Sequence, residues 1–113
     1  MNSKKLPNKL NICGKTYNIK YVKQQPYRNI KYLGRRKVVA SHDYEASIIT
    51  IWYQPDMSND YILEKLIHES LHAIEHGIKI EIGEIPVKCF APMIQALFKD
   101  NKKLRNMLDE KDK

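Results

Sequence analysis

The sequence predicts one α+β domain over residues 1–113, with a small antiparallel β-sheet followed by two helices that pack on it. Alternating apolar residues and β-branched runs fall between residues 9 and 53, which favours strands in the first half. Apolar residues recur at helical spacing from about residue 58 onward. A chain of 113 residues has room for one modest core, and its 42% hydrophobic content predicts a folded rather than a disordered protein.

Four strands are expected in the first half, over residues 9–13, 16–23, 38–40 and 47–53. The first two form a hairpin, because apolar residues alternate on both sides of the turn-forming pair Gly14-Lys15. The last run is rich in β-branched and aromatic residues and is the clearest strand of the four. A turn is expected at His42–Glu45, between the last two strands.

The first helix is predicted over residues 58–76. Ser58 is a favourable N-cap, and Asp60 places a negative charge in the first turn, where the helix dipole favours it. Gly77 stands where a helix commonly ends in a left-handed residue. Residues 77–83 are therefore expected to connect this helix to the next one.

A second helix is predicted to begin near Glu84–Pro86, since proline is well accepted in a first turn, and to persist to Leu108. Pro92 removes one backbone hydrogen bond and is expected to kink this helix. Its predicted apolar face comprises Val87, Phe90, Ala91, Ile94, Leu97 and Phe98. Residues 1–8 are expected to form a loose N-terminal arm and residues 109–113 a charged tail.

The net charge of +7 is concentrated in the N-terminal arm, in a basic loop at residues 28–37 and in residues 102–113. Solvated lysines in the tails and a flexible basic loop explain this charge better than a nucleic-acid interface, because neither a basic platform with interleaved aromatic residues nor a helix-turn-helix pattern stands out. Nucleic acid is therefore a partner that the sequence permits but does not favour. An acidic protein partner would also suit the charge.

No run in the sequence approaches the roughly 20 apolar residues of a membrane span, and the N-terminal arm lacks the apolar stretch of a signal peptide. The two cysteines, Cys13 and Cys89, fall on different predicted elements and are expected to be free thiols in a reducing compartment. The sequence therefore predicts a cytoplasmic protein with no membrane partner, and it leaves the oligomeric state open.

The most informative stretch is His68-Glu69-Ser70-Leu71-His72, an H-E-x-x-H motif inside the first predicted helix. Residues four apart lie on one face of a helix, so both imidazoles can reach one zinc ion at roughly 2.0–2.1 Å. Glu69 projects about 100° further around the helix, from where it can act as a general base on an attacking water. With four histidines in the chain, a chance match is expected in on the order of one chain in a hundred or fewer.

A catalytic zinc site needs a third protein ligand and an open position for water. His76 lies two turns from His68 on the same helix, too far for one ion, so it is expected to be solvent-exposed or to support a ligand. Glu81 and Glu84 remain, since both follow a turn that returns the chain to the first helix. Glu84 is favoured over Glu81 because apolar residues lie on its side of the second helix, which would aim it inward.

The block Leu66–Ile74 and the following Glu84-x-x-Val87-x-x-Phe90-Ala91 resemble the ImmA/IrrE-type metallopeptidases, especially their minimal phage- or mobile-element-associated members. The resemblance extends over most of residues 10–101 and is sharpest in the H-E-x-x-H block. The zinc ligands and general base that it implies are, in that order, His68, His72, Glu84 and Glu69. The chain has Val87-Lys88 where the family usually has an alanine-asparagine pair, and it lacks the extra helical material of the larger members.

The predicted function is peptide-bond hydrolysis, with zinc (Zn²⁺) as the cofactor and a protein or peptide as the substrate. The strand segment Ile48–Ile51 is expected to be an edge that pairs with extended substrate. Residue type leaves Tyr53, His42 and His76 as groups that could stabilise the oxyanion. One alternative is a non-catalytic, zinc-stabilised binding module that uses its basic surface for nucleic acid or an acidic protein. Another is a degraded peptidase kept as a decoy or adaptor, against which the intact Glu69 argues.

Overall fold

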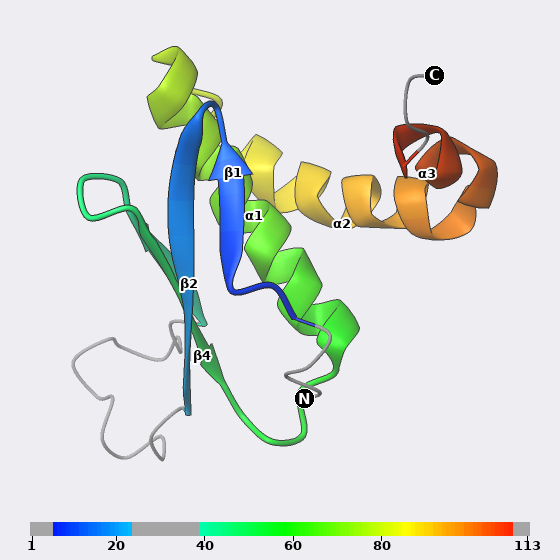
Figure 1. Ribbon diagram of the computed structural model, residues 1–113, viewed down its shortest axis with the longest axis horizontal. Coiled ribbons are helices and arrows are strands. Elements are labelled where there is room, and N and C mark those ends of the chain that lie inside the picture. Colours follow the sequence, from blue (N-terminus) through cyan, green and yellow to red (C-terminus); the bar gives the residue numbers. More distant parts are fainter. Residues whose placement is uncertain (1–5, 24–38, 110–113) are drawn as a thin grey trace.

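A computed structural model describes residues 6–23 and 39–109 of the chain and confirms the α+β class (Figure 1). The strands are β1 (Lys9–Ile12), β2 (Lys15–Lys23), β3 (Ala40–Asp43) and β4 (Ile48–Tyr53). The helices are α1 (Asn59–Ile78), α2 (Glu84–Asp100) and α3 (Lys102–Asp109). Residues 1–5, 24–38 and 110–113, and with them most of the predicted arm, the basic loop and most of the tail, lie outside the described residues.

The sheet is mixed, so the predicted wholly antiparallel arrangement is wrong in one pairing. The strand order is β1-β2-β4-β3. β1 pairs with β2 as the expected antiparallel hairpin and β3 pairs antiparallel with β4, whereas β2 runs parallel to β4 with Asn18 opposite Ile48. Alternation of apolar residues shows which face of a strand is buried, but it does not show the direction of the neighbouring strand. The predicted edge at Ile48–Ile51 is therefore an interior strand, and β3 is the edge beside it.

The core lies between one face of the sheet and α1, which runs along the sheet while α2 extends away to one side (Figure 1). Its buried side chains are Ile12, Tyr17, Ile19, Ile49, Ile51, Ile62, Leu66 and Ala73. Burial alternates along β4, where Ile49 and Ile51 are fully buried and Thr50 between them is not. Removal of this apolar surface from water is the main term that stabilises the packing of α1 on the sheet.

Residues 6–8 of the predicted loose arm are attached to the sheet. The hydroxyl of Tyr21 donates a hydrogen bond of 2.6 Å to the carbonyl of Pro7, and the amide of Ile19 donates one of 2.8 Å to the carbonyl of Asn8. Leu6 packs against the core. The prediction of a loose arm is therefore wrong for these residues, because two of their carbonyls find donors in β2.

Burial raises the pKa of Tyr21 from its ordinary 10.0 to about 12. The fold therefore favours the neutral phenol, and the contribution of Tyr21 to stability is complete below pH 10 and lost as the pH rises toward 12. We expect Tyr21→Phe to lower the free energy of unfolding by about 1 kcal/mol at neutral pH, because the hydrogen bond to Pro7 is lost. Urea unfolding at rising pH should show this difference shrinking, and a difference that grows would contradict the assignment.

α1 begins as predicted but continues past its predicted end. The side-chain oxygen of Ser58 accepts a hydrogen bond of 3.1 Å from the amide of Tyr61, as an N-cap does. The helix passes through Gly77, and Lys79 takes the left-handed conformation with φ 57°. Gly77 instead permits a close approach to the β1–β2 turn, since a Cβ at this position would lie 2.9 Å from the Cβ of Cys13.

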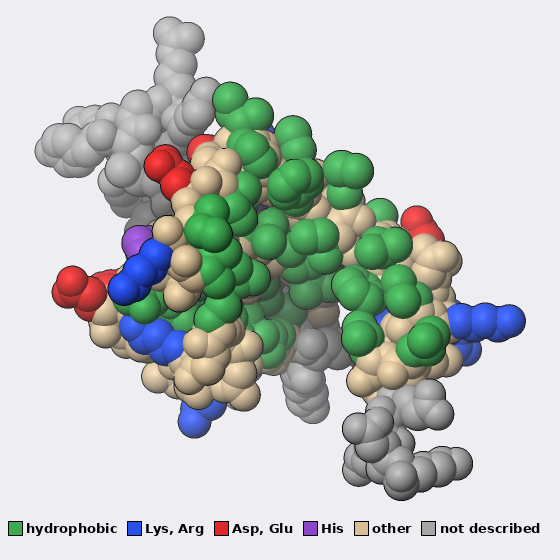
Figure 2. Space-filling view, turned by 90° about the horizontal axis from the view of Figure 1, so that it is seen from above, with side chains coloured by type: hydrophobic (Ala, Val, Ile, Leu, Met, Phe, Trp, Pro, Cys, Tyr) green, Lys and Arg blue, Asp and Glu red, His purple; other side chains and the backbone are tan. Residues whose placement is uncertain are grey.

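α2 packs against α1 through Val87 and Ala91, which are fully buried. The predicted apolar face of this helix is wider than its buried face, because α1 covers only part of that apolar face. Apolar side chains of α2 and of the connection before it therefore gather at the surface (Figure 2). The large ones are Ile80, Ile85, Phe90, Met93 and Leu97.

The predicted single helix up to Leu108 is wrong, because α2 and α3 are separate. α2 runs through Pro92 but ends before Asn101, which has φ −126° and ψ 78°. The side-chain amide of Asn101 donates a hydrogen bond of 2.8 Å to the carbonyl of Leu97, so it caps the end of α2. Within residues 6–23 and 39–109, no helix has both the length and the apolar character that a membrane span needs.

Candidate metal centre

α1 places His68 and His72 one turn apart on the same face of the helix. Their ring centroids lie 4.9 Å apart, and their side chains are 16% and 17% exposed. Leu66 and Ala73 on the neighbouring side of α1 are buried in the core, which fixes the rotation of the helix about its axis. The two imidazoles therefore share one partly sheltered surface.

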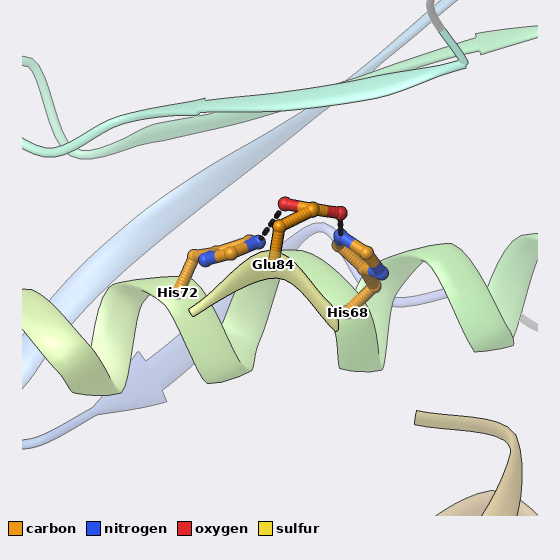
Figure 3. A group of neighbouring side chains, drawn as sticks. All are labelled: His68, His72 and Glu84. Atoms are coloured by element: carbon orange, nitrogen blue, oxygen red, sulfur yellow. Dashed lines mark hydrogen bonds and ion pairs between the residues drawn. The ribbon is translucent and has the colours of Figure 1, made fainter. Parts of the chain in front are cut away.

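Glu84, the first residue of α2, joins the two histidines (Figure 3). Its Oε1 lies 2.9 Å from Nε2 of His68, and its Oε2 lies 2.8 Å from Nε2 of His72. Across the described part of the chain, these three side chains form the group that could hold a metal ion, with ligand atoms within 4.8 Å of one another. Glu81 is exposed on the connection between the helices and is outside this group. The geometry therefore brings Glu84, and not Glu81, to the histidines.

This donor set fits a zinc ion. Two imidazole nitrogens and a carboxylate oxygen are ligands that zinc commonly takes. Tetrahedral bonds of roughly 2.0–2.1 Å would place the ligand atoms about 3.3 Å apart, whereas the nitrogen–oxygen distances here are 2.8 and 2.9 Å. A small outward movement of the carboxylate would admit the ion, and the Glu84 side chain, 64% exposed, has room for it. Three protein ligands would leave a fourth position for water.

Glu69 lies on the sheet side of α1, where only 7% of its surface is exposed. Its Oε2 is 2.8 Å from Nδ1 of His42, on the edge strand β3. His42 faces α1 because it is paired with Ile49, whose side chain is fully buried beneath the helix. The ring of His42 also stacks on that of His72, with centroids 5.7 Å apart. His42 therefore gives the buried carboxylate a polar partner beside the ligand group.

The three residues that residue type offers for stabilising an oxyanion lie at different distances from the ligand group. His42 lies at the site. His76 is exposed, and its ring lies 5.2 Å from that of His42 and 4.9 Å from that of Tyr44. Tyr53 packs against the core, about 13 Å along β4 from the residue that pairs with His42. Tyr53 is therefore too far along the strand to stabilise an oxyanion at this site.

Glu75, which the motif does not predict, contacts both parts of the site. Its Oε1 lies 2.5 Å from Nδ1 of His72, and its Oε2 accepts hydrogen bonds from the amides of Ile82 at 2.8 Å and Gly83 at 3.2 Å. The two backbone amides, and to a smaller extent His72, hold the pKa of Glu75 below its ordinary 4.5. One signal was present in the sequence: Glu75 follows His72 by three residues, a spacing at which helical side chains meet.

An open hollow of about 400 Å³ adjoins the ligand group on the side of the α1–α2 connection. It is lined by His72, Glu75, His76, Lys79, Ile80 and Glu81. Of the three residues of the ligand group, His72 lines this hollow, whereas His68 and Glu84 are not part of its lining. The hollow therefore exposes the Glu75 side of His72 to solvent.

The chain was compared with family models, curated protein sequences and solved structures, and none of them matched. The resemblance to ImmA/IrrE-type metallopeptidases is therefore a prediction that rests on the residues themselves. Those residues are placed as follows: His68, His72 and Glu84 converge, and Glu69 lies beside them against His42. Glu81, Tyr53 and His76 lie outside the ligand group.

Proposed function

We propose that this protein is a zinc-dependent peptidase, similar to minimal ImmA/IrrE-type metallopeptidases, that hydrolyses a peptide bond in a protein or peptide. The proposal is carried by the convergence of both Glu84 oxygens on the Nε2 atoms of His68 and His72, with Glu69 one position further along α1. Three ligands and an adjacent carboxylate are the groups that metal-dependent hydrolysis requires. A non-catalytic zinc-stabilised module would usually have four protein ligands, whereas the described residues bring together three.

The residues around the site have separate roles in the proposed reaction. A zinc ion held there would polarise the substrate carbonyl and lower the pKa of the attacking water to about 7. Glu69 is placed to accept the proton of that water and to deliver it to the leaving amine. His42 holds one carboxylate oxygen of Glu69 and so restricts the rotation of this side chain. The base is therefore oriented before the substrate binds.

The edge strand β3 offers a way to bind the substrate. One side of β3 pairs with β4, and the strand carries His42 toward Glu69. An extended peptide that paired with the other side would continue the sheet through main-chain hydrogen bonds. It would then run past the ligand group, next to α1. In this proposal β3 takes the role first predicted for Ile48–Ile51.

A cytoplasmic location is part of the proposal. Cys13 and Cys89 are both free thiols. They lie on separate parts of the fold, in the β1–β2 turn and on α2. Unpaired cysteines of this kind are typical of proteins in a reducing compartment.

Metal content and metal removal test the proposal. Protein produced with added zinc is expected to hold one zinc ion per chain and to hydrolyse an unstructured substrate such as casein. A chelator should abolish hydrolysis and added zinc should restore it, because the activation of water depends on the ion. Zinc should also stabilise the folded protein, by about 2.7 kcal/mol at 100 times its dissociation constant. A chain that binds no zinc under these conditions would refute the proposal.

A further inference from the structure

Glu75 lies where the two ligand-bearing helices meet, in the last turn of α1 and against the connection to α2. One of its carboxylate oxygens faces His72, and the other faces the amides of Ile82 and Gly83, directly before Glu84. We propose that Glu75 is a positioning residue of the metal centre, which sets the orientation and tautomer of His72 and fixes the backbone that delivers Glu84. This inference rests on the proposed zinc site and adds a role that the H-E-x-x-H motif does not contain.

The contact with His72 determines which ring nitrogen is available to a metal. An ionised carboxylate only accepts hydrogen bonds, so Nδ1 of His72 must donate to Glu75. A neutral imidazole has one proton on its ring nitrogens, and the contact of Nε2 with Glu84 competes for it. The Glu75 side chain is 13% exposed and that of Glu84 64%, so water weakens the contact with Glu84 more. The proton therefore stays on Nδ1, and Nε2 carries the lone pair that a metal would bind. Carboxylates placed behind metal-binding histidines in this way fix the tautomer and raise the basicity of the ligand.

The contact with the connection determines where α2 begins. The backbone carbonyl of Glu75 accepts the amide of Lys79 at the end of α1, and its side chain then accepts the amides of Ile82 and Gly83. Gly83 is the N-cap residue of α2, with φ 98° and no side-chain cap. Glu75 therefore supplies a side-chain acceptor at a helix N-terminus whose N-cap residue has none. Glu84 follows Gly83 directly, so its position depends on this contact.

Glu75→Gln separates the two contacts with little change of shape. If the amide oxygen faces Ile82 and Gly83, the NH₂ group faces Nδ1 of His72 and can only donate to it. His72 would then carry its proton on Nε2, the atom that must bind the metal. If the amide is turned over, its NH₂ group faces two backbone N–H donors, and both of those hydrogen bonds are lost. Neither orientation preserves the whole arrangement.

Zinc affinity, measured by competition with a chromophoric chelator, tests the inference directly. We expect Glu75→Gln to bind zinc about 10–100-fold more weakly than the wild type, the usual loss when a carboxylate behind a ligating histidine is replaced. The matched control is Glu81→Gln, which removes an exposed carboxylate from the lining of the same hollow. Its affinity should stay within about twofold of the wild type, because exposed charges interact weakly in water. Wild-type affinity in Glu75→Gln, or equal losses in both variants, would overturn the inference.

A second readout needs no metal. At a pH where the ring is neutral, nitrogen–proton correlation spectra of the metal-free wild type should show His72 protonated at Nδ1, and hydrogen exchange should be slow at the amides of Ile82 and Gly83. Glu75→Gln should lose at least one of these two properties, and retention of both would overturn the role of Glu75. A wild type that has both properties but binds no zinc would refute the proposed zinc site instead. The two failures are therefore distinguishable.

Hydrogen exchange in the wild type provides the test if Glu75→Gln does not fold. The amides of Ile82 and Gly83 donate to one oxygen of the Glu75 carboxylate, and His72 contacts the other oxygen of the same carboxylate. Their exchange is therefore expected to slow further when saturating zinc fixes that histidine. Exchange at these amides that zinc leaves unchanged would show that Glu75 does not couple the ligand to the connection.

Discussion

Glu69→Gln is expected to lower the kcat of peptide hydrolysis by about 10²–10⁴-fold, the usual contribution of a general base. The glutamine side chain has nearly the same shape and can still contact His42 in its buried position. It cannot, however, accept a proton from the attacking water. Zinc affinity should change little, because Glu69 is outside the ligand group of His68, His72 and Glu84. A fall in kcat with retained zinc would therefore assign proton transfer to Glu69.

Steady-state kinetics at saturating zinc, with zinc content determined on the same samples, is the measurement for Glu69→Gln. Glu81→Gln serves as the control, since it also removes a carboxylate but one that is exposed on the connection. This control should retain the wild-type kcat. An unchanged kcat in Glu69→Gln would remove the basis for the proposed reaction. A parallel loss of kcat and zinc would instead show that Glu69 supports the ligands.

Much of the secondary structure could be predicted because burial on one side of an element leaves a periodic pattern in the sequence. Ile49 and Ile51 repeat every second residue in β4, and Ile62 and Leu66 repeat at helical spacing in α1. The parallel pairing of β2 with β4 leaves no such pattern, because it depends on the path of the chain between these strands. The predicted end of α1 is wrong for a related reason. Gly77 does not end the helix but lies close to Cys13 in the β1–β2 turn, a contact between segments far apart in the sequence.

At the candidate site, too, contacts within one helix could be predicted, whereas contacts between distant segments could not. The relation of His68 to His72 could be predicted because both belong to one helix with a fixed spacing. The contact between His42 and Glu69 could not, because it requires β3 to lie at the sheet edge beside α1. The choice of Glu84 over Glu81 depends on a connection whose backbone includes a left-handed Lys79. Residue types narrowed that choice, but only the folded connection shows which carboxylate reaches the histidines.

Glu84→Gln is expected to weaken zinc binding by more than the roughly 10–100-fold that follows loss of a supporting carboxylate, because it removes a direct ligand. An amide oxygen is neutral, and zinc sites in proteins are built from cysteine, histidine and carboxylate side chains. Hydrolysis at limiting zinc should fall in proportion, and excess zinc should restore part of it. Calorimetric titration with zinc would measure the change in affinity for each variant.

The stability of the metal-free protein shows whether Glu84→Gln loses zinc because a ligand is missing or because the protein unfolds. Glu84 is 64% exposed, so its ion pairs with His68 and His72 contribute little in water. The free energy of unfolding of Glu84→Gln should therefore stay within about 0.5 kcal/mol of the wild type. Glu81→Gln is the matched control and should keep wild-type zinc affinity. If Glu81→Gln lost zinc while Glu84→Gln retained it, the third ligand would be Glu81, and the connection between α1 and α2 would have to rearrange to bring it to the histidines.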